Sequence, residues 1–527
     1  NANNPNKSTK APSPALTAPA LWFGPVQNGK VQMYSASVST YPDSSSSRIY
    51  LQNLKRKTDS NRPGRYSLAD LSASDIQSKE PTFTSRQTII RLDGGVRHIQ
   101  LDRNNEVTSF NGDNGTFGIV NEGSVVPESN EWKKVLLPWT VRGVNDDQFK
   151  TFNKEEKNGK PKYSQKYRSR DNGNNSKRDL GDIVNSPIVA VGGYLATSAN
   201  DGMVHIFKKG NGGDERNYSL KLSYIPGTMP RKDIESKDST LAKELRAFAE
   251  KGYVGDRYGV DGGFVLRQVN NLNGQDRVFM FGAMGFGGRG AYALDLTKAD
   301  GNDPTKASLF DVKDNGNNGN NGNNRVELGY TVGTPQIGKT HNGKYAAFLA
   351  SGYATKEITS GENKTALYVY DLENNNGTPI AKIEVPNGKG GLSSPTLVDK
   401  DLDGTIDIAY AGDRGGKMYR FDLSSQSPDQ WTVRPIFEGT KPITSAPAIS
   451  QLKDKRVVIF GTGSDLSEED VDNNDIQSIY GIFDNDTDTG TAQDGQGKGL
   501  LEQKLSEENK TLFLTDYKRS DGSGDKG

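Results

Sequence analysis

Five stretches of the chain share one pattern, in which aromatic and aliphatic residues alternate over five or six positions and four of the five close on Asp. Such alternation predicts a β-strand. A run rich in small and apolar residues stands before each stretch, and in four cases a small residue followed by Pro stands earlier still. The aromatic stretches are MVHIF at 203–207, AYALDL at 291–296, LYVYDL at 367–372, MYRFDL at 418–423 and IYGIFD at 479–484.

Each repeat therefore predicts three or four antiparallel strands joined by tight turns. A sheet of that size cannot bury both faces alone, so neighbouring repeats must stack on one another. Stacked four-stranded sheets in a ring form a β-propeller, and the sequence predicts an all-β fold of this class with long loop insertions. One insertion predicts a short helix, because Leu241, Leu245 and Phe248 share a face between the cap residues Asp238–Ser239 and Gly252.

The same features predict the limits of the domains. Residues 1–20 are rich in Pro, Ala, Ser and Asn, which is typical of a flexible linker. We expect one β-propeller domain over 21–515 and a flexible tail over 516–527. Within the domain, 181–484 holds the five clear repeats and 485–515 would close the ring. Residues 21–180 would supply one or two divergent blades and insertions or, alternatively, a separate N-terminal β domain. The Asn- and Gly-rich run at 314–324 predicts a solvated loop.

Composition excludes several classes of protein. The 527 residues hold 66 Lys and Arg against 66 Asp and Glu, so a globally basic nucleic-acid-binding protein is excluded. There is no cysteine, which excludes disulfides, thiolate zinc sites and thiol catalysis. No apolar run approaches the roughly 18 residues of a membrane span, so no transmembrane segment is expected. No signal peptide begins at Asn1, which indicates a mature form or a fragment.

One nine-residue loop concentrates acidic side chains at regular spacing. Carboxylates stand at its positions 1, 3, 5 and 9, and Gly404 permits a sharp turn. Alternate side chains of such a loop point inward, and the carbonyl at position 7 is the natural backbone ligand. Hard oxygen donors at this density favour calcium over zinc or copper. The predicted calcium ligands are Asp399, Asp401, Asp403, the carbonyl of Thr405, and Asp407.

The flanking sequence distinguishes this loop from a helical EF-hand. An EF-hand needs a bidentate Glu at position 12, where this chain has Tyr410. The flanks SPTLV and IAYAG are strand-like, so we expect the loop between two strands of one blade, with Asp407 as the bidentate ligand. The alternative is an acidic surface turn without metal, but four Asp in nine residues repel one another unless a cation neutralises them.

Two further acidic segments have weaker patterns. Asp484, Asp486 and Asp488 share the 1-3-5 spacing, but position 9 is Ala492, so a solvated turn is favoured over a second metal site. The acidic run at 464–475 lacks regular spacing and is interpreted as an exposed loop.

Motifs for phosphate binding, polyanion binding and catalysis are not supported either. Gly285–Gly290 precedes a strand rather than a helix, which favours a tight turn over a phosphate-binding loop. The basic tract at 157–178 is interpreted as a solvated loop, with contact to a polyanion as the alternative. His205 is expected in the core or on a blade face, and no catalytic residue is predicted. His98 lies in a strand-like run and His341 in a turn.

Four segments, in this order, resemble the C-terminal region of the PilC family of type IV pilus-associated tip adhesins, most closely its neisserial members. Single motifs of this kind are shared with quinoprotein-type propellers, and the ordered combination is more specific. The segments are LGDIVNSP with ANDGMVH at 180–205, YIP with YGVDG at 224–262, GFGGRGAYALD at 285–295, and the acidic loop within the sequence from Ser393 to Leu423.

The resemblance implies a modified, seven-bladed, quinoprotein-like β-propeller with a calcium site on one blade. It implies an extracellular, non-enzymatic protein at the pilus tip and the outer-membrane surface, peripheral to that membrane. Such a protein supports pilus assembly by opposing retraction, with calcium occupancy as a regulator, and adheres to host cells. The implied partners are type IV pilins or minor pilins and a host-cell surface receptor that the sequence does not identify.

The alternative function is a quinoprotein-like calcium-dependent dehydrogenase, which shares the blade motifs and uses pyrroloquinoline quinone. Such enzymes often have adjacent cysteines, and this chain has none. Of its four tryptophans only Trp431 falls within the repeats, so the Trp-docking pattern of those enzymes is missing.

Overall fold

The computed structural model divides the chain into two compact units, Asn1–Lys313 and Asp314–Gly527, and each is described by itself. The structure describes residues 20–27, 30–37, 47–58, 61–62, 66–68, 80–83, 86–141, 146–164, 167, 179–230, 240–251, 258–314, 325–353, 364–374, 376–466, 468–487, 490–495, 497–519 and 524–527.

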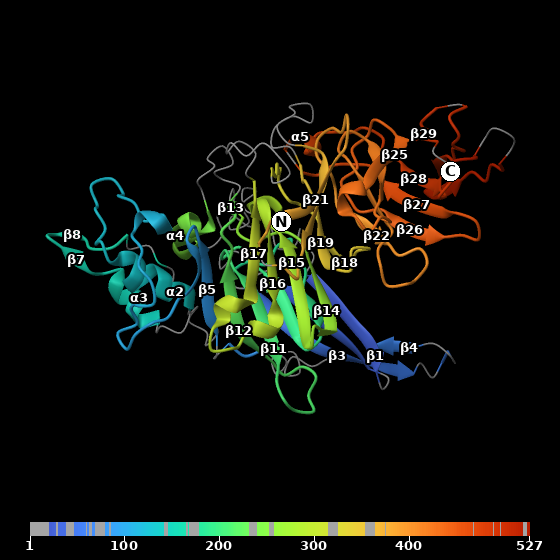
Figure 1. Ribbon diagram of the computed structural model, residues 1–527. Helices are drawn as coiled ribbons and strands as arrows, with labels where there is room; N and C mark the ends of the chain where they lie inside the picture. Colours follow the sequence, from blue (N-terminus) through green and yellow to red (C-terminus); the bar gives the residue numbers. More distant parts are fainter. Residues whose placement is uncertain are drawn as a thin grey trace. The chain divides into compact units, whose positions relative to one another are not determined.

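In the residues that the structure describes, the first unit contains three main sheets and one small hairpin (Figure 1). The first sheet holds, in order, β1 (Ala20–Gln27), β2 (Lys30–Ser37), β3 (Arg48–Thr58) and β4 (Tyr66–Leu68). The second holds β6 (Gly95–His98), β5 (Gln87–Leu92), β12 (Tyr218–Ile225), β11 (Val204–Lys209), β10 (Tyr194–Ser198) and β9 (Val189–Val191). The third holds β13 (Met229–Pro230), β16 (Gly288–Asp295), β15 (Gln275–Ala283) and β14 (Phe264–Leu272), with β17 (Ser308–Lys313) also paired to β16. The hairpin is β7 (Glu156–Lys157) with β8 (Lys160–Pro161).

Helical segments of the first unit are short. They are η2 (Gly115–Phe117), η3 (Trp132–Leu136), α2 (Leu137–Val141), α3 (Asp146–Phe152), α4 (Leu241–Lys251), η5 (Gly285–Gly287), η6 (Leu296–Lys298) and η7 (Pro304–Ala307). The predicted helical insertion is confirmed as α4, in which Leu241, Leu245 and Phe248 are all buried. Its predicted cap residues Asp238, Ser239 and Gly252 lie outside the described residues.

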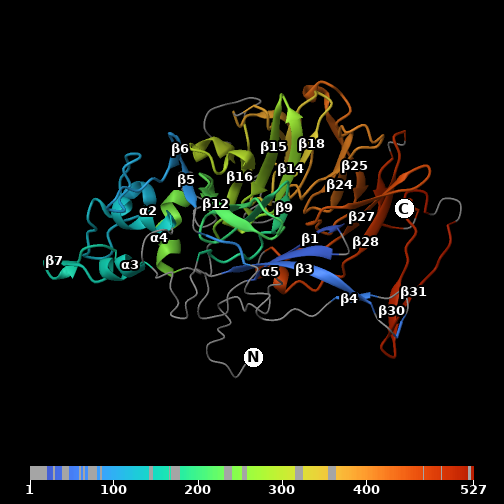
Figure 2. The same ribbon diagram turned by 90° about the horizontal axis from the view of Figure 1, so that it is seen from below.

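The second unit also contains three main sheets and a hairpin. The first sheet holds β18 (Gln336–Lys339), β19 (Tyr345–Ala350), β20 (Ala366–Asp371) and β21 (Pro379–Glu384). The second holds β22 (Thr396–Val398), β23 (Ile408–Gly412), β24 (Lys417–Asp422), β25 (Thr432–Glu438) and β29 (Ala492–Gln493). The third holds β26 (Ala448–Gln451), β27 (Arg456–Gly461) and β28 (Ile479–Asp484). Figure 2 shows β30 (Leu505–Glu508) and β31 (Thr511–Leu514) as a separate hairpin, and the helical turns are η8 (Pro428–Gln430) and α5 (Glu468–Val471).

The middle sheet of the second unit is buried on both faces, because its residues alternate between two cores. Ala409, Ala411 and Phe421 pack in one cluster with Phe348 and Val369 of the β18–β21 sheet. On the other face, Ile408, Tyr410 and Met418 pack with residues of the β26–β28 sheet, among them Val458 and Ile482. The period-2 pattern of a strand thus supplies apolar side chains to two neighbours at once.

The first unit repeats this arrangement. On one face of the β9–β12 sheet, Leu195 and Phe207 pack with Ile49 of β3. On the other face, Ala196 and Ile206 belong to a cluster that includes Tyr292 of β16. The predicted stacking of small sheets is therefore confirmed within each unit, and the prediction of an all-β fold is confirmed.

The five predicted repeats match five sheets strand for strand. The aromatic stretches form β11, β16, β20, β24 and β28, and the runs of small residues before them form β10, β15, β19, β23 and β27. Each pair is antiparallel, as the repeat predicts. Residues ahead of the first repeat contribute the β1–β4 sheet, and β5 extends the first repeat by pairing in parallel with β12.

The predicted domain limits stay predictions. Residues 1–19 of the linker, 315–324 of the Asn- and Gly-rich run and 520–523 of the tail lie outside the described residues. Close to the chain end, the carbonyl of Lys526 accepts a hydrogen bond from the amide of Phe483 in β28 at 2.8 Å. Every helix that the structure describes is too short or too polar to span a bilayer.

Different crowding around two equivalent glycines predicts different effects of substitution. Gly412 ends β23 and Gly461 ends β27, the strands formed by the runs of small residues in their repeats. A Cβ at Gly412 would lie 2.5 Å from the Ile443 side chain, whereas a Cβ at Gly461 would meet nothing within 4 Å. Gly412→Ala should therefore lower the free energy of unfolding by about 1–3 kcal/mol through overpacking. Gly461→Ala should change it by less than about 0.5 kcal/mol. Urea denaturation of both variants measures this, and equal losses would contradict the packing.

Candidate metal centre

The acidic loop joins β22 to β23, two antiparallel strands of one sheet. The pairing runs up to Val398 and Ile408, and the amide of Asp407 donates to the carbonyl of Val398 at 2.9 Å. The loop therefore begins and ends at a fixed hydrogen-bonded position. Its predicted place between two strands of one sheet is confirmed.

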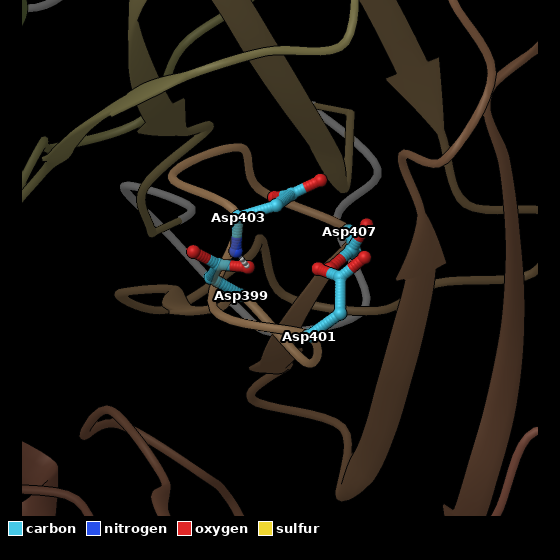
Figure 3. A group of neighbouring side chains, drawn as sticks. All are labelled: Asp399, Asp401, Asp403 and Asp407. Atoms are coloured by element: carbon cyan, nitrogen blue, oxygen red, sulfur yellow. Dashed lines mark hydrogen bonds between the residues drawn. The ribbon is translucent and has the colours of Figure 1, made fainter.

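Four carboxylates of this loop converge. One oxygen each from Asp399, Asp401, Asp403 and Asp407 lies within 4.8 Å of the other three. Figure 3 shows the four side chains coming from the one loop, with the carboxylates of Asp401 and Asp407 facing one another. Asp401 and Asp403 are exposed, whereas Asp407 is only 3% exposed. The cluster thus opens to solvent on one side and is anchored in the protein on the other.

Two backbone amides of the loop donate hydrogen bonds to the carboxylate of Asp399 and so curve the loop toward it. The amide of Gly404 donates to Asp399 Oδ2 at 2.8 Å, and the amide of Asp403 donates to Oδ1 at 3.2 Å (dashed line in Figure 3). The turn needs left-handed backbone at Leu402, with φ 56°, and at Gly404, with φ 89°. Glycine adopts this conformation without steric cost, which explains Gly404.

Asp403 and Thr405 are linked side chain to side chain. The Oγ1 of Thr405 donates to Asp403 Oδ1 at 2.6 Å, and the amide of Thr405 donates to the same oxygen at 2.9 Å. These bonds favour the ionised carboxylate, so they lower the pKa of Asp403, with the side-chain bond as the larger cause. The role of the Thr405 carbonyl as a ligand stays a prediction.

Asp407 is held by both of its oxygens. The amide of Lys400 donates to Oδ2 at 2.9 Å. The imidazole Nε2 of His341 lies 2.7 Å from Oδ1. His341 belongs to the turn between β18 and β19, in the neighbouring sheet. Sequence reasoning placed His341 in a turn but missed this contact, since no spacing along the chain links two residues 66 positions apart.

The donor set fits a hard cation. Among the described residues, the cluster consists of four carboxylates and includes no sulfur or imidazole nitrogen. Carboxylates and carbonyls in a flexible loop suit Ca²⁺, which accepts six to eight oxygen ligands, better than Mg²⁺, which demands near-octahedral geometry. The four aspartates can therefore hold a metal ion.

The second acidic segment is an ion-pair network in the described residues. Asp484 is 3% exposed and accepts hydrogen bonds from the Tyr410 hydroxyl and the Arg420 guanidinium. Nitrogens of Arg434 and Arg456 lie 3.4 and 3.7 Å from it. The interpretation as a solvated turn is therefore wrong for Asp484, because arginines from three other strands surround it. Asp488 lies outside the described residues.

Asp486 extends this network toward the surface. It accepts hydrogen bonds from Arg420 at 2.9 Å and from Arg456 at 3.0 Å, and the Lys400 ammonium lies 3.5 Å away. Burial disfavours the charged carboxylate, but the arginine hydrogen bonds outweigh burial and lower the pKa of Asp486 to about 2. Asp484 and Asp486 thus have cationic side chains as partners.

The remaining candidates have structural roles where they are described. His205 is buried as predicted, with Nδ1 2.8 Å from Ser223 Oγ and Nε2 3.0 Å from Asp201 Oδ2. Ser223 is fully buried, so this Ser–His–Asp group cannot reach a substrate. The turn predicted at Gly285–Gly290 is confirmed for Gly285–Gly287, which form η5, whereas Gly288–Gly290 already belong to β16.

The basic tract and the acidic run are described only in part. Lys157 pairs with Glu128 at 2.8 Å and Lys162 with Glu155 at 3.1 Å, and Tyr163 is fully buried. Residues 165–166 and 168–178 lie outside the described residues. In the acidic run, Asp470 accepts a hydrogen bond from Ser464 at 2.6 Å. The described residues of that run do not form a cluster of metal ligands.

A comparison with models of protein families identifies the family to which this chain belongs. The model of the PilY1 β-propeller domain matches residues 180–518. The chain belongs to the PilY1 β-propeller family. The predicted β-propeller class and the resemblance to type IV pilus-associated tip adhesins are thereby confirmed. The number of seven blades and a special closeness to neisserial members stay predictions.

Curated PilY1 relatives match about three fifths of this chain. The type IV pilus biogenesis factor PilY1 of Pseudomonas aeruginosa strain PAK is 28% identical over 387 residues, which are 61% of this chain and 30% of that protein. A PilY1 homolog of Xylella fastidiosa strain Temecula1 is 29% identical over 309 residues, which are 57% of this chain and 21% of that protein. The chain thus spans less than a third of the length of these relatives.

A solved PilY1 structure is also similar. The crystal structure of the Pseudomonas aeruginosa PilY1 C-terminal domain is 26% identical and covers 61% of this chain and 65% of that chain, with a TM-score of 0.42.

The pKa of Asp486 predicts how its ion pairs respond to acid. A carboxylate whose pKa is lowered on folding stabilises the protein above its unfolded pKa, here 3.8, and that contribution disappears as pH falls through about 2. Asp486→Asn should therefore be less stable than wild type at pH 7, and the difference should shrink between about pH 4 and pH 2. Thermal unfolding midpoints across this range measure it.

The control for this prediction is Asp472→Asn, which changes an exposed carboxylate of the same unit. The thermal unfolding midpoint of this control should stay close to that of wild type at every pH. If the midpoints of Asp486→Asn and wild type differ by the same amount at every pH, the assigned ion pairs are contradicted.

Proposed function

We propose that this chain is a calcium-binding, non-enzymatic part of a type IV pilus biogenesis factor and adhesin. It acts outside the cell, at the pilus tip and the outer-membrane surface, and is peripheral to that membrane. Its partners are type IV pilins or minor pilins and a host-cell surface receptor. The observation that carries the proposal is the convergence of four aspartates in a loop of a PilY1-family propeller.

Calcium is the ion that the loop chemistry favours. The proposed ligands are Asp399, Asp401, Asp403, the carbonyl of Thr405, and Asp407. Two of the aspartates are exposed, so an ion can enter from solvent, and its charge offsets the repulsion among four carboxylates. Bound calcium tightens the loop and changes the charge of this surface from strongly negative toward neutral.

Two observations support the proposed role in the pilus: the names of the relatives and the kind of surface that carries the loop. The relatives named PilY1 are type IV pilus biogenesis factors. Loops held on a rigid stack of sheets are suited to binding other proteins. A loop whose charge and order depend on calcium is a switch for such an interaction. We propose that occupancy of this loop sets how strongly the protein opposes pilus retraction.

Asp407→Ala should abolish high-affinity calcium binding, since it removes the one buried carboxylate of the cluster. Isothermal titration of the purified chain with calcium chloride measures this. The matched control is Asp422→Ala, which removes an exposed carboxylate at the end of β24 and should bind calcium like wild type. An unchanged titration in Asp407→Ala would contradict the ligand assignment.

In cells that produce the full-length protein, Asp407→Ala should reduce the number of surface pili and adhesion to host cells. If the variant loses pili because they retract too often, pili should return in a second background in which retraction is blocked. Pilus counts by electron microscopy in both backgrounds measure this. Normal piliation, retraction and adhesion in the variant would show that calcium has no regulatory role.

A simple spectrum separates this proposal from a quinoprotein dehydrogenase. Purified protein incubated with calcium and pyrroloquinoline quinone, then freed of excess quinone, should retain no quinone absorbance. Stoichiometric retention would favour the dehydrogenase.

A further inference from the structure

The turn between β18 and β19 reaches into the acidic loop of the neighbouring sheet. His341 lies in this turn, and its Nε2 is 2.7 Å from Asp407 Oδ1. The His341 side chain is 21% exposed and that of Asp407 4%, so little water competes for this contact. Two separate sheets thus contribute to the geometry of one carboxylate.

The turn itself is fixed. The amide of Thr340 donates to the carbonyl of Lys344 at 2.9 Å, and the amide of Gly343 donates to the carbonyl of Thr340 at 2.9 Å. The imidazole is therefore presented from a closed, hydrogen-bonded turn. Such a turn holds the ring at a defined place relative to the sheet.

The same β18 segment also holds the backbone of the loop. The amide of Ile406 donates to the carbonyl of Lys339 at 2.8 Å, and Lys339 and Thr405 form a parallel β-bridge. The backbone contact at Lys339 and the side-chain contact at His341 lie two residues apart, at the end of β18 and in the turn that follows it. Together they attach positions 7, 8 and 9 of the loop to the neighbouring sheet.

Both oxygens of Asp407 are therefore oriented by other groups. His341 contacts Oδ1, and the Lys400 amide donates to Oδ2 at 2.9 Å. Carboxylates that bind metals are commonly oriented by such outer hydrogen bonds, and loss of an outer partner typically weakens metal binding about 10–100-fold. A carboxylate that is already oriented loses less conformational freedom when the ion binds.

We propose that His341 is a positioning residue for calcium, which orients Asp407 from the adjacent sheet and makes the ion site a junction between the two sheets. The inference rests on the proposed calcium binding. It adds that ion occupancy and the β18–β19 turn are coupled: calcium orders this turn, and the turn raises the affinity for calcium.

The direct test is calcium titration calorimetry on the purified full chain. His341→Ala should raise the Kd for calcium about 10–100-fold. His341→Gln retains an N–H donor of similar reach and should bind close to wild type. The matched control is His98→Ala, which changes a histidine of β6 in the first unit and should leave the Kd unchanged.

Hydrogen exchange provides a second readout that a general loss of stability would not produce. In wild type and His341→Gln, calcium should slow amide exchange in residues 340–344. In His341→Ala the same saturating calcium should slow exchange in the acidic loop but not in this turn. Thermal unfolding without calcium shows whether the variant is folded.

The outcomes separate the inference from the proposed function. If wild type binds no calcium, the proposed function is wrong. If wild type binds calcium and His341→Ala binds equally well, the positioning role is overturned while calcium binding stands. If His341→Gln is as weak as His341→Ala, a hydrogen bond from position 341 does not set the affinity, and the inference is also overturned.

Discussion

The fold depends on the burial of small sheets against one another. A three- or four-stranded sheet has two apolar faces, and in the second unit the β22–β25 sheet buries both, against Phe348 and Val369 on one side and Val458 and Ile482 on the other. Full burial of a large apolar side chain contributes about 1.5–3 kcal/mol, so such faces are the main source of stability. Glycine in these strands leaves room for close neighbours, as the contact between Gly412 and Ile443 shows.

The packed sheets hold the acidic loop in a defined geometry. The loop leaves the partly buried β22 and leads into β23, which is buried throughout and pairs with β22, so its two ends are fixed. Asp407 stands at the re-entry point and is the buried member of the cluster, whereas Asp401 and Asp403 face solvent. The charges therefore lie where an ion can reach them, and the geometry comes from groups that the core holds in place.

The repeats and the acidic loop could be predicted from the sequence because their signals are local. Alternation over six residues identifies β20 or β24, and a 1-3-5-9 spacing identifies the loop. The contacts from other sheets could not be predicted. Asp484 and Asp486 show the same 1-3-5 spacing as Asp399 and Asp401, yet Arg420, Arg434 and Arg456 surround Asp484. These arginines come from β24, β25 and β27, so only the folded chain distinguishes an ion-pair network from a metal loop.

The proposed function depends on calcium binding by the four-aspartate loop. The most direct test of this binding is a crystal structure of the protein crystallised with calcium, in which anomalous scattering locates the ion. We expect one ion about 2.3–2.6 Å from oxygens of Asp399, Asp401, Asp403 and Asp407 and from the Thr405 carbonyl. No ion in this loop at saturating calcium, or an ion bound only at Asp484 and Asp486, would contradict it.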